Sequence, residues 1–430
     1  MDVLIELGEV PKHREQPSGD PPARATFSAR AVLGLLAAAL LAALGGAGHR
    51  PPPQPPRIIA ARLGDAAFLD GDRLYVISAG RPVAGSRVLS RTVSTYAVPQ
   101  ARLLSRTSVE VSGGVVGAWR APGAVLVAYQ VDTSGTWAVA ALGVDTDRVL
   151  WRRAARLIGV SAADRLAVLE TADAELGVDL VTGRTRWSVP HPVDGFTAHA
   201  GIENGFPRWL VTATDSGRLE ARDARTGQVI GEVALPRRPG RANGVIWPVG
   251  DLVLVDTFGS GFDAFRLPGL QRVWRTPVDL SQSWMQADCV RLICTFHRQW
   301  GMTVLDPLTG RELWTSDRWE YAEPTGNYLL ARVDDRNSAQ PSLWVLDAAT
   351  GRALGNFGAW KGLGPAGDGQ LYGMREDRDN HRILYGVLDP ATQGVRVLGS
   401  ADRVSGGCET EGPVLICRLV DASIAVWDLR

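Results

Sequence analysis

The stretch VLDPLTGRELW, from Val304 to Trp314, gives the clearest indication of how this chain folds. An apolar pair ends in an aspartate, a Thr-Gly pair follows, and a run rich in β-formers closes on a tryptophan. A carboxylate at the start of a turn accepts backbone N–H groups two residues later, and a glycine after it adopts a positive φ without steric cost. The stretch therefore predicts a strand, a tight turn and a second strand that carries the tryptophan.

The same phrase recurs through the chain. It returns as VDLVTGRTRW at 178–187, as RDARTGQVI at 222–230 and as VLDAATGRAL at 345–354. A degenerate copy, AFRLPGLQRVW, lies at 264–274. The marker aspartates are Asp179, Asp223, Asp306, Asp347, Asp389 and Asp428. A spacing of about 40 residues, with turn signals between short runs of β-formers, is typical of the blades of a β-propeller.

Two sets of repeated residues have predicted positions. The residues expected at the turns are Asp179, Gly183, Asp223, Gly227, Asp306, Gly310, Asp347, Gly351 and Asp389. The tryptophans expected on outer strands are Trp151, Trp187, Trp274 and Trp314. The turn role explains the spacing of the aspartates, so we assign them no catalytic chemistry.

The pattern Asp-x-x-Thr-Gly-x-x-x-Trp resembles the repeat of pyrroloquinoline-quinone-type (PQQ-like) propellers, clearly over residues 140–430 and weakly over 58–140. The chain looks like an actinobacterial-type, membrane-anchored and non-enzymatic member of that group. The resemblance implies that the tryptophan of each last strand docks on the neighbouring blade.

The repeats predict an all-β, PQQ-like β-propeller of about eight four-stranded blades, preceded by one transmembrane helix. Repeats end near residues 151, 187, 231, 274, 314, 355 and 398. The tail 399–430 supplies about three strands more, and we expect the missing strand from the start of the domain, for example 86–94, because closure removes an exposed edge. Seven blades is the alternative, if 100–151 is not a complete blade.

Four regions follow from composition: a cytoplasmic disordered tail (1–30), a transmembrane signal anchor (31–48), a proline-rich linker (49–57) and the propeller (58–430). The uncharged segment AVLGLLAAALLAALGGAG at 31–48 spans about 27 Å as a helix, near the thickness of a bilayer core. A cleaved signal peptide and a buried helix fit less well. We expect a single-pass protein of the cytoplasmic membrane with an extracytoplasmic propeller.

The four cysteines form two similar pairs, Cys289 with Cys294 and Cys408 with Cys417, and each pair ends in the phrase LIC. Four cysteines permit three connectivities, and the repeated placement favours two local disulfides. Four buried free thiols are the alternative. Disulfides would match an oxidising, extracytoplasmic location.

Few features of the sequence indicate catalysis or ligand binding. The formal net charge is zero, which gives no electrostatic case for binding nucleic acid. Quinoprotein dehydrogenases carry adjacent cysteines and calcium ligands, whereas this sequence has no Cys-Cys pair. His191 and His199 are interpreted as part of a polar loop rather than a metal pair. We therefore expect no enzyme activity and assign no catalytic, cofactor-binding or metal-ligating residue.

Two charge-dense segments, 334–340 and 375–381, are interpreted as solvated hairpin tips, with a calcium or partner site on one rim as the alternative. The predicted function is a membrane-tethered, non-catalytic scaffold for an unknown envelope protein, resembling the quinone-type propeller of the Gram-negative outer-membrane assembly machinery. The membrane contact would run through residues 31–48. A quinoprotein oxidoreductase and a sensor of small ligands are the alternatives.

Overall fold

The computed structural model describes one of two compact units of the chain, Pro53–Arg430. The residues described are 55–430, apart from 87, 132–134, 145, 147, 194, 215–216, 236–245, 257–260, 281–282, 298–300, 320, 334–341 and 378. This part of the chain consists of strands and turns and contains no helix.

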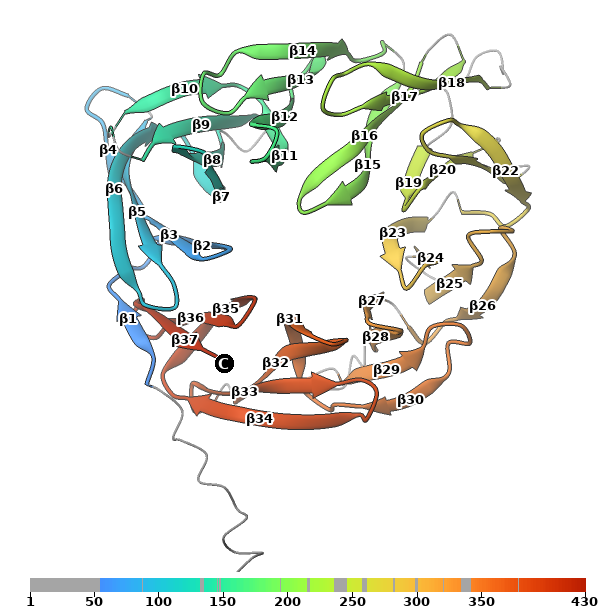
Figure 1. The fold of residues 1–430 in the computed structure, drawn as a ribbon. Coiled ribbons are helices and arrows are strands. Elements are labelled where there is room, and N and C mark those ends of the chain that lie inside the picture. The colour runs from blue at the N-terminus through green and yellow to red at the C-terminus, as the bar shows by residue number, and fades with distance from the viewer. Residues whose placement is uncertain are drawn as a thin grey trace, which may run out of the picture. The chain divides into compact units, whose positions relative to one another are not determined.

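The strands form nine sheets arranged as the blades of a ring (Figure 1). The first blade has β2 (Ala66–Asp70), β3 (Arg73–Ile77), β4 (Arg81–Pro82), β5 (Leu89–Ala97) and β6 (Arg102–Val111). The second has β7 (Gly114–Ala121), β8 (Ala124–Gln130), β9 (Trp137–Gly143) and β10 (Val149–Arg153). The third has β11 (Arg156–Ser161), β12 (Leu166–Glu170), β13 (Ala174–Asp179) and β14 (Thr185–Pro190).

The next three blades follow the same order. The fourth has β15 (Phe196–Glu203), β16 (Phe206–Ala213), β17 (Arg218–Asp223) and β18 (Val229–Ala234). The fifth has β19 (Ile246–Val249), β20 (Leu252–Asp256), β21 (Phe262–Arg266) and β22 (Gln271–Thr276). The sixth has β23 (Ser283–Cys289), β24 (Leu292–His297), β25 (Gly301–Leu305) and β26 (Glu312–Ser316).

The last three blades complete the ring. The seventh has β27 (Tyr321–Thr325), β28 (Tyr328–Arg332), β29 (Leu343–Asp347) and β30 (Ala353–Asn356). The eighth has β31 (Lys361–Gly367), β32 (Gln370–Asp377), β33 (Arg382–Asp389) and β34 (Gly394–Ala401). The ninth has β35 (Val404–Glu411), β36 (Val414–Leu419), β37 (Ile424–Asp428) and, from the other end of the unit, β1 (Arg57–Ile59).

The expected fold class is corrected by this count, because the ring has nine blades and neither eight nor seven. The missing blade is the first one. Its outer hairpin, β5 and β6, turns at Val98-Pro99 and lacks the Asp-x-x-Thr-Gly phrase, so the repeat pattern does not reveal it. The described residues also include no helix able to span a membrane, and the transmembrane segment expected over 31–48 lies outside them.

The ring closes between the two ends of the unit, but not through the expected segment. Residues 89–94, within the proposed 86–94, lie in β5 of the first blade, where Arg91 pairs with Val109 of β6. The closing strand is β1, which pairs antiparallel with β37 and places Ile59 opposite Ile424. The ninth blade is therefore complete, and β37 has no free edge.

Apolar side chains fill the space between neighbouring blades. The second and third strands of each blade are the most buried. Because side chains alternate along a strand, successive residues face opposite neighbouring blades. In β8, Val125 and Val127 pack with Tyr75 of the first blade, whereas Leu126 packs with Leu169 of the third. Each blade is thus held by its neighbours rather than by a core of its own.

The connectivity gives the ring two different rims. In each blade the first strand lines the centre and the fourth lies outside (Figure 1). Because consecutive strands are antiparallel, the turns that join strands one and two, and three and four, lie on one rim, which we call the turn rim. The turns between strands two and three, and the connections between blades, lie on the opposite rim.

Candidate functional site

The repeated aspartates all act as turn acceptors on the turn rim. After β25, the Asp306 carboxylate accepts the Leu308 N–H at 2.9 Å and the Thr309 hydroxyl at 2.6 Å. Gly310 has φ 68° and donates its N–H to the Asp306 carbonyl at 2.8 Å. The other turns are built in the same way around Asp179 and Gly183, Asp223 and Gly227, and Asp347 and Gly351. Asp389 accepts the Ala391 N–H, with Gln393 in the position of the glycine.

Hydrogen bonds within the turns also lower the pKa of two of these carboxylates, Asp179 and Asp347. A hydrogen bond from Arg186, and then one from the backbone of Thr182, hold the pKa of Asp179 well below its usual range. The Thr350 hydroxyl lowers the pKa of Asp347 in the same way. Asp179 and Asp347 are therefore structural acceptors and have no proton to offer near neutral pH.

Each repeated tryptophan reaches across to the next blade. Trp314 donates its indole N–H to the Ala348 carbonyl at 3.0 Å, and a Cβ placed on Gly351 would lie 2.6 Å from its ring. The glycine is therefore needed both for its φ of 69° and for the space above it. The same bond joins Trp151 to Leu180, Trp187 to Arg225 and Trp274 to Pro307.

The docking tryptophan and the turn glycine are both replaced at the degenerate repeat, residues 264–274, and on the strand that packs against it. On β18, Gly231 stands where β14 carries Trp187. A Cβ at Gly231 would lie 2.1 Å from the carbonyl oxygen of Pro268, in the worn turn of the next blade. The two backbones come together directly here, so no aromatic ring is needed between them.

Both expected disulfides are present. Cys289 is bonded to Cys294 and Cys408 to Cys417, with Cα–Cα distances of 5.8 and 4.1 Å. Each bond joins the first and second strands of its blade, β23 to β24 and β35 to β36. Neither pair is adjacent in sequence, unlike the vicinal disulfide of the quinoprotein dehydrogenases.

The rim opposite the turn rim carries every histidine that the structure describes. His191 lies in the connection after β14, His199 near the start of β15, and His297 and His381 at turns between second and third strands. We call this side of the ring the histidine rim. His13 and His49 lie outside the described residues.

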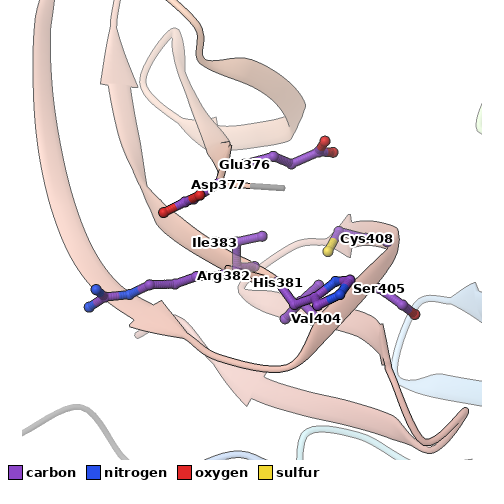
Figure 2. Close-up of a pocket in the computed structure, with 9 residues that line it drawn as sticks. Glu376, Asp377, His381, Arg382, Ile383, Val404, Ser405 and Cys408 are labelled. Carbon is purple, nitrogen blue, oxygen red and sulfur yellow. The ribbon is translucent and has the colours of Figure 1, made fainter. Parts of the chain in front are cut away.

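A cavity of about 420 Å³ opens on the histidine rim between the eighth and ninth blades (Figure 2). Glu376, Asp377, His381 and Arg382 line it from one blade, and Ser405 and Cys408 from the other. Lys361 pairs with Glu376 at 2.8 Å. Three residues of the charge-dense segment 375–381 therefore border a cavity, namely Glu376, Asp377 and His381. Segment 334–340 lies outside the described residues.

Aromatic and cationic side chains gather on the same rim at the sixth and seventh blades. Trp284, on β23, the innermost strand of the sixth blade, is 44% exposed and stacks on Tyr321 of β27 with ring centroids 5.7 Å apart. The exposed Arg318 guanidinium lies 4.4 Å from the Trp319 ring and 4.5 Å from the Trp344 ring. Trp284 and Arg318 are thus exposed on this rim beside the partly buried rings of Tyr321 and Trp344, and we call this group the aromatic surface.

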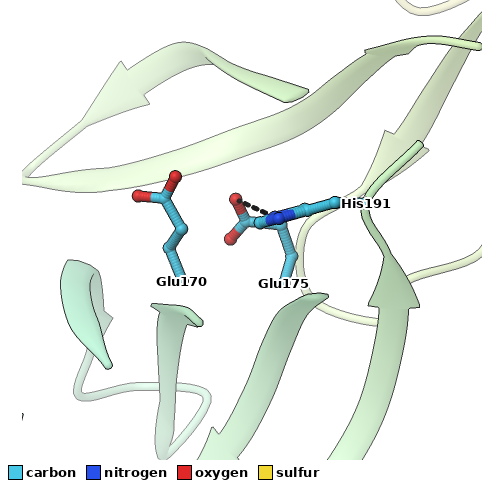
Figure 3. Close-up of side chains that lie close together, drawn as sticks. All are labelled: Glu170, Glu175 and His191. Atoms are coloured by element: carbon cyan, nitrogen blue, oxygen red, sulfur yellow. Dashed lines mark ion pairs between the residues drawn. The ribbon is translucent and has the colours of Figure 1, made fainter. Parts of the chain in front are cut away.

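Two acids and two histidines converge between the third and fourth blades. Glu170 ends β12, Glu175 lies opposite it on β13, and His191 follows β14 (Figure 3). The Glu175 side chain is fully buried, with its Oε1 3.1 Å from His199 Nε2 and 3.5 Å from His191 Nε2. One ligand atom from each of Glu170, Glu175 and His191 lies within 4.8 Å of the other two.

Sequence reasoning missed this cluster. His191 and His199 were interpreted as part of a polar loop. In the structure His191 follows the third blade, His199 lies in the fourth, and both contact Oε1 of Glu175. The two glutamates gave no signal of their own, since they flank an ordinary hairpin. A histidine pair beside two glutamates, all near one connection between blades, was the available clue.

The chain matches no protein-family model and no curated protein sequence. Its fold is similar to that of several solved structures. A eukaryotic initiation factor is 10% identical, with a TM-score of 0.53, and the match covers 81% of this chain and 90% of that one. This similarity supports the propeller fold alone.

Two further structural neighbours are PQQ-like propellers in architecture. BamB from Moraxella catarrhalis is 14% identical with a TM-score of 0.39, covering 87% of this chain and 97% of that one. The dihydro-heme d1 dehydrogenase NirN is 14% identical with a TM-score of 0.45, covering 81% of this chain and 77% of that one.

Proposed function

We propose that the propeller is a non-catalytic scaffold that binds an envelope protein through its histidine rim, outside the cytoplasm. The observation that carries the proposal is the group formed by the exposed Trp284 and Arg318 and the half-buried Tyr321 at the sixth and seventh blades. Tryptophan, tyrosine and arginine are the residue types that dominate the binding energy of protein interfaces.

The ring suits this role because its neighbouring blades are rigidly joined. Indole N–H bonds and shared apolar clusters link one blade to the next, as Trp314 links β26 to the turn of the seventh blade. Binding surfaces are commonly carried by loops on such a scaffold. Four outer turns of the turn rim repeat a single structural motif, at Asp179, Asp223, Asp306 and Asp347, whereas the histidine rim differs from blade to blade.

The aromatic surface is also pre-organised. Trp284 stacks on the buried Phe296 at 4.5 Å as well as on Tyr321, and Arg318 lies between two indole rings. Side chains that are already fixed lose less rotamer entropy when a partner binds. The best-matched partner offers an apolar side chain to Trp284 and an acidic group to Arg318.

The location outside the cytoplasm rests on the two disulfides, since structural disulfides persist in oxidising compartments. Alkaline phosphatase fused after Arg430 should be active in cells, and β-galactosidase fused at the same point should be inactive. The reverse pair of activities would place the propeller in the cytoplasm and contradict this part of the proposal.

The binding face is tested by paired variants of the full chain. Partners crosslinked in cells are quantified by mass spectrometry for Trp284→Ala and for Leu308→Ala, which removes an apolar side chain 71% exposed on the turn rim. Loss of a hot-spot tryptophan should weaken capture by about 30-fold, whereas Leu308→Ala should leave it unchanged. Loss of capture in Leu308→Ala alone would assign binding to the other rim.

A further inference from the structure

We propose that the histidine rim holds a divalent transition-metal ion of the Zn²⁺ class, bound by Glu170, Glu175 and His191 (Figure 3). The site lies at the third and fourth blades, away from the aromatic surface of the sixth and seventh. It does not depend on the scaffold function, and either proposal can fail without the other.

The first argument is the charge of the two glutamates. Glu170 and Glu175 face each other directly across β12 and β13, where like charges destabilise a sheet. Arg156 pairs with Glu170. Glu175 is fully buried and, within the part of the chain that the structure describes, has no arginine or lysine partner. A buried carboxylate is costly unless a cation compensates it.

The second argument is a pair of unused atoms that face this space. Glu175 Oε2 is buried without a hydrogen-bond partner, and His191 Nε2 has none either, since its 3.5 Å contact with Glu175 Oε1 does not have the geometry of a hydrogen bond. Buried polar atoms are nearly always satisfied, so each orphan needs an explanation. A cation between the carboxylate oxygen and the imidazole nitrogen would satisfy both atoms at once.

The donor set selects the kind of ion. Ca²⁺ and Mg²⁺ prefer all-oxygen sites, whereas an imidazole with carboxylates suits Zn²⁺ and its first-row neighbours. Ligands bound at about 2.0–2.2 Å to a tetrahedral ion stand about 3.4 Å apart. The three ligand atoms, within 4.8 Å of one another, need only small side-chain movements to close on an ion. Three protein ligands would leave a fourth position open.

Two neighbours would position the ligands without binding the metal. His199 Nε2 lies 3.1 Å from Glu175 Oε1 and fixes the orientation of that carboxylate. Arg156 does the same for Glu170. Outer partners of this kind typically change metal affinity by about 10–100-fold when they are removed. His199 is therefore a positioning residue.

The test uses the full chain, stripped with a chelator and then titrated with Zn²⁺. Metal content after gel filtration should be one equivalent per chain, and X-ray absorption should show nitrogen and oxygen ligands at about 2.0–2.2 Å. Glu175→Gln and His191→Ala should lose the bound ion, and His199→Ala should weaken binding by about 10–100-fold. His381→Ala, on the same rim beside another cavity, is the matched control and should bind normally.

Several results would overturn the proposal. These are the absence of a stoichiometric ion in the wild-type chain, undiminished binding by Glu175→Gln, and loss of binding by His381→Ala. Sulfur ligands at about 2.3 Å would place the ion at cysteines instead. Circular dichroism of each metal-free variant separates a lost ligand from a lost fold. The wild-type absorption spectrum decides the ligand set even if a variant fails to fold.

Discussion

Replacing Trp314 with alanine should lower the free energy of unfolding by about 3–5 kcal/mol, as truncation of a packed tryptophan commonly does. The indole ring packs over Gly351 of the next blade and donates its N–H to Ala348 at 3.0 Å. Its removal leaves a gap between two blades and an unpaired carbonyl. The midpoint of denaturant unfolding measures the loss.

Two further variants separate the causes. Trp314→Phe keeps an aromatic ring but loses the N–H donor, so it should cost less than the alanine variant. Trp284→Ala removes a tryptophan that is 44% exposed and should cost about 0.5–1.5 kcal/mol, the range of an aromatic pair. A Trp314→Ala chain with unchanged stability and lost partner capture would show that this tryptophan serves binding rather than docking.

Replacing Ile59 with aspartate should destabilise the ring by a comparable amount, about 3–5 kcal/mol, because an unpaired carboxylate would enter a buried site. Ile59 lies opposite Ile424 and packs in a cluster with Leu74 and Val76 of the first blade. The same variant should accelerate hydrogen exchange of the β37 amides, which lose their partner when β1 detaches.

The neighbouring residue of the same strand provides the control. Ile58 is 54% exposed, so Ile58→Asp adds the same charge without burying it. Its effect should stay within about 0.5 kcal/mol, as for most surface substitutions. Equal effects of the two variants would mean that β1 does not close the ring.

The turns and the docking tryptophans could be predicted because the residues of each repeated stretch have a physical role within that stretch. Asp306, Gly310 and Trp314 lie within one short stretch, and the aspartate and glycine meet there through local bonds. The disulfides were predictable for the same reason, since Cys408 and Cys417 are 9 residues apart on paired strands. Turns and short hairpins depend on residues that are close in sequence, so their repeats can be recognised from the sequence.

The number of blades could not be predicted in the same way. The first blade uses an outer hairpin of 9 and 10 residues, β5 and β6, that turns at a proline. This blade is held in place by apolar packing, for example of Tyr75 and Ile77 against the second blade. Such packing does not require a repeated sequence motif. A blade without the phrase was therefore not counted, and residues 86–94, most of which lie in β5 of this blade, were assigned to the last blade.

The acid–histidine cluster was missed because it depends on the stacking of blades. Glu170 and Glu175 come from one hairpin, whereas His199 comes from the first strand of the next blade. The angle and distance between blades bring them together. Sequence spacing alone cannot supply that information, and the histidines follow no familiar metal motif.

The assignment of binding to the histidine rim is tested most directly by photo-crosslinking from single positions in living cells. Benzoylphenylalanine placed at Trp284 keeps an aromatic ring on the histidine rim, and the same residue at Leu308 probes a more exposed site on the turn rim. We predict a discrete covalent adduct with one envelope protein from position 284 and none from 308. An adduct from 308 alone would contradict the account.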